Sequence, residues 1–236
     1  MKALPDWHHI DLVVFDVDGT LYDQRRLRFA MLGLLLSDAW RLRSLDTLKT
    51  LRTFRRVREA LGDKPEADFM RLQYARTAAQ HHKTEDDVRL LTADWLEQRP
   101  LPALPACRYA QVEAVFAGLQ AAGKRIAVFS DYPAVDKLKA LGLQADLVVC
   151  ATDPSIARLK PDPAGLLSIL RQTHIAPQRT LMIGDRFDRD GAVAQRAGVH
   201  ALIRSRKPHP EFATFQTYAD PVFHPLLKGA PVRAAA

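Results

Sequence analysis

The sequence has 236 residues, with 34 Lys and Arg against 27 Asp and Glu, which gives a formal net charge of +7. Hydrophobic residues make up 47% of the chain and charged residues 26%, a balance that excludes wholesale disorder. No run approaches the roughly 18 apolar residues of a membrane span, and no signal-peptide core precedes residue 10. Because two cysteines are too few for a disulfide framework, we expect a reduced, cytoplasmic protein.

The positive charge is concentrated in one segment. Residues 25–58 contain ten basic and two acidic side chains, so this segment alone carries +8 and the rest of the chain about −1. Lys49, Arg52 and Arg56 recur at helical spacing and are predicted to share one helix face. Such a run is most often a solvated face, and the alternative is a surface that attracts an anionic ligand.

The chain begins with a predicted buried strand at residues 10–15, after which the pattern changes. Residues 23–99 have a helical pattern without a strand, and the Pro-rich residues 100–105 are predicted to form a linker. Short apolar strands then alternate with helices, which indicates a parallel sheet covered on both faces. The predicted strands are 125–129, 145–150, 180–183 and 200–203, the helices are 108–122, 132–141, 162–173 and 188–197, and residues 221–236 are predicted to be irregular.

Polar side chains follow four of these strands. In open α/β folds, ligands bind at the carboxyl ends of the strands. A hard, oxygen-ligated ion such as Mg²⁺ would suit a group of carboxylates collected there, while a hydroxyl and an ammonium would hold phosphate oxygens. The strand-end residues are Asp16, Asp18, Gly19 and Thr20 after the first strand, Ser130 and Asp131 after the second, Lys160 after the third, and Gly184 and Asp185 after the fourth.

Each of these motifs is weak by itself. An Asp-x-Asp sequence is usually a surface turn, and a Gly-Asp pair after a strand is often only a helix cap. Gly19 lets the backbone turn so that amide groups face phosphate oxygens. Although each motif is weak alone, the four occur in order at the ends of successive predicted strands. Together they predict phosphoryl transfer through a carboxylate.

The four motifs resemble those of the haloacid dehalogenase superfamily, which includes the aspartate-nucleophile phosphatases. The resemblance covers roughly residues 10–205 and is strongest in the opening sequence Val-Phe-Asp-Val-Asp-Gly-Thr-Leu at residues 14–21. It implies an α/β fold with a Rossmann-like parallel sheet core, formed by residues 1–21 and 101–236. An all-helical cap, residues 22–100, is inserted after the first strand.

The resemblance also implies a role for each motif residue. Asp16 would be the nucleophile that forms an aspartyl-phosphate, and Asp18 would protonate the leaving alkoxide and then activate water. The phosphate-binding residues would be Ser130, Lys160, Gly19 and Thr20. The ligands of Mg²⁺ would be Asp16, Asp18 through its backbone carbonyl, Asp185 and Asp190, the last either as a ligand or as a group that holds Lys160.

Asp18 also distinguishes between reactions of the superfamily. Dehalogenases and phosphonatases lack an acid at this position, so its presence favours a C–O–P ester. We predict a Mg²⁺-dependent phosphatase that acts on a small phosphorylated metabolite. The alternatives are a sugar phosphomutase, which keeps both aspartates, and a polyanion-binding protein that uses the basic cap.

Further predictions concern the partners of the protein and the charged residues near the motifs. We expect neither nucleic acid nor a membrane as a partner, and an exposed apolar face of the cap could pair two subunits in a homodimer. Arg25, Arg26 and Arg28 lie where the chain leaves the catalytic loop for the cap, and we expect one of them to meet the substrate and the others to face solvent. Asp131 must point away from the phosphate site or be paired, with Arg186 as one candidate.

Overall fold

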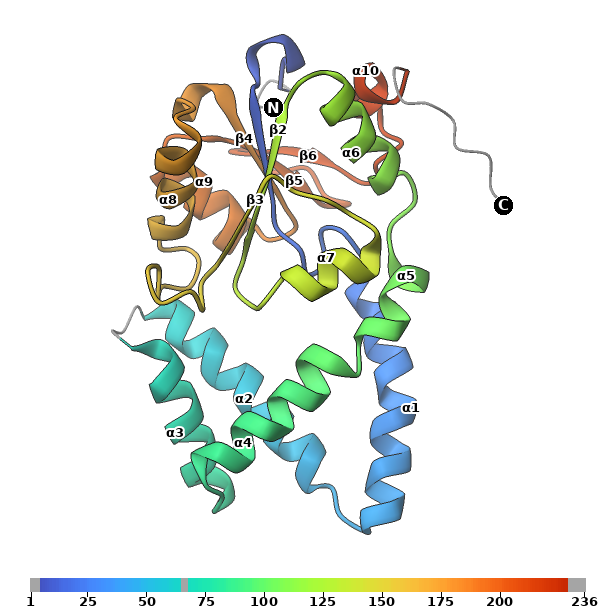
Figure 1. Cartoon of the computed structure of the whole chain (residues 1–236), viewed down its shortest axis with the longest axis vertical. Helices are drawn as coiled ribbons and strands as arrows, with labels where there is room; N and C mark the ends of the chain where they lie inside the picture. The colour runs from blue at the N-terminus through green and yellow to red at the C-terminus, as the bar shows by residue number, and fades with distance from the viewer. Residues whose placement is uncertain (1–4, 65–67, 229–236) are drawn as a thin grey trace.

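A computed structural model describes residues 5–64 and 68–228. Its centre is a six-stranded parallel sheet in the order β3-β2-β1-β4-β5-β6 (Figure 1). The strands are β1 (Leu12–Phe15), β2 (Arg125–Ser130), β3 (Leu147–Cys150), β4 (Thr180–Gly184), β5 (His200–Arg204) and β6 (Ala213–Phe215).

Both faces of the sheet are covered because its strands are apolar on both sides. In β1, Val13 and Phe15 point to one face, and Leu12 and Val14 point to the other. The first face packs against α6 (Val112–Ala121), α7 (Val135–Leu141) and α10 (His224–Leu227), and the second against α8 (Ala164–Thr173) and α9 (Ala192–Arg196).

The order of the strands reverses at β1, which creates the site. From β1 the chain builds β2 and β3 on one side and then β4, β5 and β6 on the other. Parallel strands end at the same edge, so the loops after β1, β2 and β4 meet there. Such a switch point is where open α/β sheets bind their ligands.

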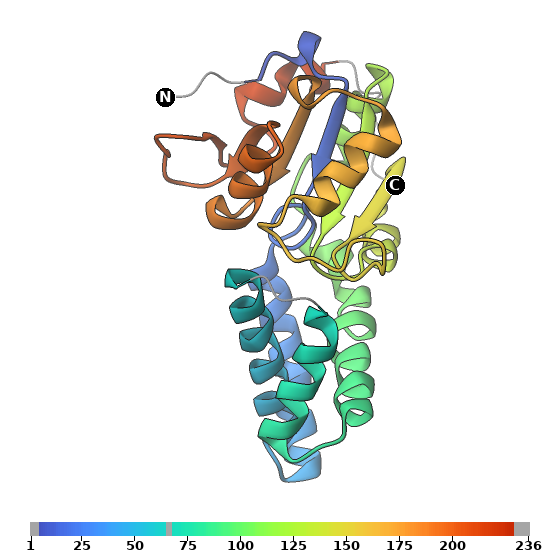
Figure 2. The same cartoon turned by 90° about the vertical axis from the view of Figure 1, so that its left-hand side faces the viewer.

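The helical segment lies against this edge of the sheet (Figure 2). In the sequence, its helices come between β1 and the rest of the core, and in space they lie beyond the carboxyl ends of the strands (Figure 1). They are α1 (Gln24–Leu42), α2 (Asp46–Asp63), α3 (Phe69–His81), α4 (Glu85–Thr92) and the π-helical turn η2 (Ala93–Gln98). α1 leaves Phe29 76% and Trp40 87% exposed, so an exposed apolar face exists, and its pairing in a homodimer stays a prediction. None of the helices in the described residues is long and apolar enough to cross a membrane.

Two predictions about irregular segments are wrong. Residues 101–107 are helical, as η3 (Leu101–Ala103) and α5 (Leu104–Cys107), because proline is well tolerated in the first turn of a helix. The first part of the predicted irregular tail forms η6 (Pro221–Phe223) and α10, with Phe223 buried against the core. Residues 229–236 of that tail lie outside the described residues.

Candidate active site

Asp16 lies in a buried charge cluster directly after the central strand. The ammonium of Lys160 donates to Oδ1 of Asp16 at 2.6 Å and to Oδ1 of Asp190 at 2.7 Å. The hydroxyl of Thr20 donates to Oδ2 of Asp16 at 2.9 Å. Burial raises the pKa of Asp16 well above its usual range, and the positive charge of Lys160 limits this rise. The cluster thus holds the predicted nucleophile in a fixed orientation beside one cation.

Asp190 holds this arrangement together. Its second oxygen accepts the backbone N–H groups of Asp185 at 3.1 Å and Arg186 at 3.0 Å. Both oxygens of Asp190 are therefore occupied, one by Lys160 and the other by the loop after β4. This geometry matches the expectation that Asp190 holds Lys160.

Asp185 supplies the third carboxylate of the cluster. Unlike those of Asp16 and Asp190, its carboxylate has no hydrogen bond or ion pair within residues 5–64 and 68–228. Oxygens of Asp16, Asp185 and Asp190 all lie within 4.8 Å of one another. Burial, followed by repulsion from Asp190, raises the pKa of Asp185 to about 7. Three carboxylates face one ammonium here, so with all three ionised the negative charges exceed the positive by two.

The donor set fits a divalent cation. Hard ions such as Mg²⁺ bind carboxylate oxygens, and a charge of +2 would balance the excess on the three aspartates. The carboxylate of Asp185 can lie beside Asp16 only because Gly19 lacks a side chain. A Cβ at Gly19, whose φ is +93°, would overlap the carboxylate of Asp185. The side chain of Asp18 is not part of this three-aspartate group, and its contribution through the backbone carbonyl stays a prediction.

Asp18 has its own cation. The ammonium of Lys137 lies 2.6 Å from Oδ1 and 2.9 Å from Oδ2 of Asp18, and the hydroxyl of Tyr22 also donates to Oδ1. Burial alone would raise the pKa of Asp18, but the charge of Lys137 and these hydrogen bonds hold it below its usual value. The free protein therefore favours the ionised form of Asp18.

Sequence reasoning missed Lys137. The signal was its position: Ala134, Leu138 and Leu141 are buried around it, so a lysine at residue 137 lies on the inner side of α7. A charged residue on such a face needs a partner. The sequence alone does not show that this partner is Asp18.

Ser130 and Asp131 lie at the end of β2, as predicted. The hydroxyl of Ser130 accepts the backbone N–H of Tyr132 at 3.2 Å and is almost fully buried. Oδ1 of Asp131 accepts the backbone N–H of Lys160 at 3.0 Å, so the extra acid is paired with the third motif and not with Arg186. Binding of phosphate by Ser130, Lys160, Gly19 and Thr20 stays a prediction, and in this structure the hydroxyl of Thr20 is directed to Asp16.

Arg58 is a cap residue that reaches the core. It is buried, with its guanidinium 3.9 Å from the ring centroid of Tyr132, and it donates to the backbone carbonyl of Asp131. It also donates to the side chain of Gln73 at 3.0 Å. Arg58 therefore belongs to the contact between cap and core, whereas the sequence pattern placed it in a solvated charge run.

A second arginine crosses from the core to the cap. Arg189 is buried and donates to Asp63 at 2.6 Å and to the backbone carbonyl of Lys160 at 2.9 Å. Gly62 allows this approach, because a Cβ there would overlap the guanidinium of Arg189. Arg186 binds both oxygens of Glu59 at 2.9 and 3.0 Å. α2 is thus bound to the loop that carries Asp185.

The charge cluster opens into a cavity of about 400 Å³ between cap and core. Arg28, Arg55 and Arg56 line it together with Asp16 and the other motif carboxylates. Arg25 and Arg26 are exposed and are not among its lining residues, so Arg28 is the one of these three arginines that reaches the cavity. On the cap side, the cavity is also lined by Gln24, Leu27, Glu59, Leu96 and Pro100.

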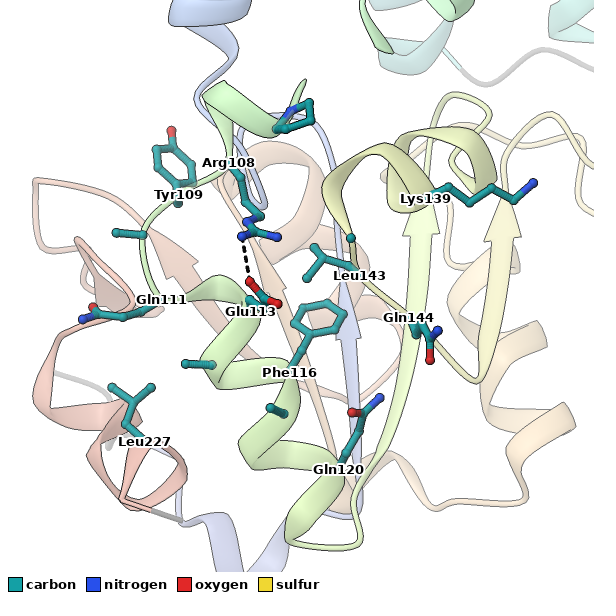
Figure 3. Close-up of a pocket in the computed structure, with 15 residues that line it drawn as sticks. Arg108, Tyr109, Gln111, Glu113, Phe116, Gln120, Lys139, Leu143, Gln144 and Leu227 are labelled. Carbon is teal, nitrogen blue, oxygen red and sulfur yellow. Dashed lines mark hydrogen bonds and ion pairs between the residues drawn. The ribbon is translucent and has the colours of Figure 1, made fainter. Parts of the chain in front are cut away.

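A larger cavity of about 1140 Å³ lies elsewhere, over α6 and the end of α7 (Figure 3). No motif residue lines it. The charges on its wall are paired: Arg108 binds Glu113 at 2.7 Å, and Lys139 binds Asp136 at 3.2 Å. Without an uncompensated charge or a nucleophile, this cavity has no counterpart of the chemistry at Asp16.

Comparisons with known proteins identify the family of this chain. The sequence model of the haloacid dehalogenase-like hydrolases matches residues 10–198, so the chain belongs to this family of hydrolases. The phosphoglycolate phosphatase of Rhodospirillum rubrum is 32% identical over 109 residues, which cover 45% of this chain. The match also spans only 45% of that relative's length.

Solved structures share the fold. A HAD phosphatase from Thermococcus onnurineus is similar with a TM-score of 0.63 at 20% identity, over 88% of this chain and 94% of that chain. A 2-haloacid dehalogenase from Pseudomonas syringae is similar with a TM-score of 0.60 at 21% identity, also over 88% and 94%. Because both reactions occur on this fold, the residues of the site must distinguish between them.

Proposed function

We propose that this hydrolase is a Mg²⁺-dependent phosphatase that cleaves a small-molecule phosphate monoester through an aspartyl-phosphate. The observation that carries the proposal is the presence of two separate carboxylates, each bound to its own ammonium: Asp16 with Lys160, and Asp18 with Lys137. A halide leaves without a proton, whereas an alkoxide needs one. A second acid beside the nucleophile therefore favours an ester substrate over an organic halide.

The reaction would take place in two transfers. In the first, an oxygen of Asp16 bonds to phosphorus, the bond from phosphorus to the leaving oxygen breaks, and Asp18 gives that oxygen a proton. In the second, water attacks phosphorus, Asp18 takes a proton from the water, and the bond between phosphorus and Asp16 breaks. Asp18 needs a proton for the first transfer, and the negative charge of an entering phosphate would raise its pKa.

Asp16 and Asp185, with the backbone carbonyl of Asp18, would hold Mg²⁺, and Asp190 would lie beside it. When bound, the ion neutralises negative charge on the phosphoryl group. Lys160 would offer its ammonium to the same oxygens. The cap would exclude water from the first transfer.

The variant Asp16→Asn tests the proposal, because it keeps the size of the side chain and replaces the nucleophilic carboxylate with an amide, which is a poor nucleophile. We expect it to abolish Mg²⁺-dependent hydrolysis of 4-nitrophenyl phosphate while circular dichroism and the melting temperature show a folded protein. Hydrolysis by this variant at the rate of the wild type would overturn the proposed mechanism. Release of inorganic phosphate, as opposed to an isomerised sugar phosphate, separates a phosphatase from a phosphomutase.

Binding of a polyanion by the cap is the alternative from another class. Such binding would weaken steeply with salt because each phosphate contact releases counterions. Within the charge run, Arg58 is buried and Arg41 is paired with Asp38 at 3.2 Å. These contacts reduce the charge available to a polyanion, and absence of salt-dependent binding to nucleic acid would dispose of this alternative.

A further inference from the structure

Lys137 is a buried lysine whose ammonium contacts both oxygens of Asp18. It is 8% exposed, and its Nζ lies 2.6 and 2.9 Å from the two carboxylate oxygens. Lys137 and Lys160 are the two buried lysines within the described part of the chain. Lys160 forms ion pairs with Asp16 and Asp190. The cation paired with Asp18 is Lys137, which belongs to none of the four motifs.

The contacts fix Asp18 from two sides. Tyr22, at the start of the cap, donates its hydroxyl to Oδ1 of Asp18. Lys137 approaches from α7, which is anchored by Leu138 and Leu141 in the core and ends at Gly142 in the left-handed conformation. Because α7 is packed on the sheet, the position of the ammonium is set by a rigid element.

This ion pair is costly to build as a merely structural feature. Burying a lysine and a carboxylate removes both from water, and the attraction between them often only offsets that cost. Both side chains also line the cavity that contains Asp16. The pair is largely buried, with 10% of the Lys137 side chain and 18% of the Asp18 side chain exposed. Such a pair at the reacting end of a cavity is better explained by a requirement for position than by a gain in stability.

We infer that Lys137 is a positioning residue that, with Tyr22, holds the carboxylate of Asp18 where it meets the leaving oxygen. The inference rests on the proposed function. Proton transfer by a positioned side chain typically contributes 10²–10⁴-fold to a rate, and a displacement of about 1 Å can remove about 100-fold. Without Lys137, the carboxylate of Asp18 keeps only the hydrogen bond from Tyr22 and is held less firmly, so the transfers that need its proton become slower.

The experiment compares kcat/KM for phosphate esters whose leaving oxygens differ in basicity: 4-nitrophenyl phosphate, phenyl phosphate and an alkyl phosphate. A weakly basic leaving oxygen needs little help from an acid, and a strongly basic one needs much. For Lys137→Met we expect a loss of a few-fold with 4-nitrophenyl phosphate that grows to about 100-fold with the alkyl ester. Lys137→Arg, which keeps the charge, should recover part of that loss.

Matched controls separate position from folding. Lys139→Met makes the same change on the same helix, at a side chain that is 73% exposed, and should leave all three substrates unchanged. Tyr22→Phe removes only the hydroxyl and should show the same dependence on the leaving group in weaker form. In an Asp18→Asn background, Lys137→Met should add no further dependence on the leaving group.

The outcomes are distinct. An equal loss on all three esters, or a full effect of Lys137→Met in the Asp18→Asn background, would overturn the role of Lys137. A wild-type protein that hydrolyses none of the esters with Mg²⁺, or an Asp16→Asn variant with normal turnover, would instead overturn the proposed function. If Lys137→Met does not fold, Lys137→Gln and Tyr22→Phe give the same comparison.

Discussion

Replacing Asp185 with Asn should stabilise the protein in the absence of metal and remove its response to Mg²⁺. Asp185 is the carboxylate of the site without a partner in the described residues, and burial together with Asp190 raises its pKa from 3.8 to about 7. One pKa unit corresponds to about 1.4 kcal/mol. Ionising Asp185 at pH 8 therefore destabilises the folded protein by about 4 kcal/mol, which partial solvent contact reduces to about 2 kcal/mol.

The pH dependence of this destabilisation follows from the raised pKa of Asp185. The folded protein keeps the proton of Asp185 at pH values where the unfolded chain has lost it, so this destabilisation is absent below about pH 4 and complete above about pH 7. In EDTA at pH 8, Asp185→Asn should raise the melting temperature by roughly 4–8 °C, at about 2–4 °C per kcal/mol for a domain of this size. The gain over the wild type should shrink toward pH 4.

Thermal unfolding with added Mg²⁺ gives the second half of the test. At a Mg²⁺ concentration 100 times the Kd, a single site stabilises the folded state by about 2.7 kcal/mol. The wild type should show this rise in melting temperature, and Asp185→Asn should lose most of it. An Asp185→Asn protein less stable than the wild type in EDTA at pH 8, or equal Mg²⁺ responses in both proteins, would refute the reasoning.

Two further predictions concern the cap. Because Arg28 and Arg55 line the cavity and Arg25 does not, Arg28→Gln with Arg55→Gln should raise KM for a phosphate ester several-fold. Arg25→Gln is the matched control and should leave KM unchanged. An unchanged KM in the double variant, or an equal rise with the control, would refute this assignment. Arg189→Met should lower the free energy of unfolding by about 2–4 kcal/mol, because the buried guanidinium joins cap and core. Glu59→Gln, at an exposed partner of the same arginine, should lower it by less than about 1 kcal/mol, and similar losses in the two variants, measured by urea unfolding, would contradict this ranking.

Much of the core could be predicted from local patterns. The apolar runs within residues 125–129 and 180–183 predicted strands that the structure contains, since a strand buried on both faces needs apolar side chains along its buried length. The predicted parallel sheet is confirmed. β6 (Ala213–Phe215) was missed because three residues are too few to show a strand pattern. α10 was missed because its partners in the core are remote in the sequence.

The residues of the site likewise fall into those that the sequence predicts and those that depend on tertiary packing. Asp16, Asp18 and Gly19 are neighbours in the chain, so their spacing carries their chemistry, and parallel pairing of β1 with β4 brings Asp185 to the same edge. Lys160 was predicted beside them for the same reason. These assignments need only the order of the strands and the positions of the polar residues at their ends.

The supporting contacts depend on how separate helices pack. Lys137 and Asp18 are 119 residues apart, and Arg58 and the carbonyl of Asp131 are 73 apart. The sequence by itself determined the family motifs and the sheet, because both follow from residues close together in the chain or from strand periodicity. Only the tertiary structure decided which lysine meets Asp18 and which arginines face the cavity, because those contacts are set by the packing of α2 and α7 around the carboxyl ends of the strands.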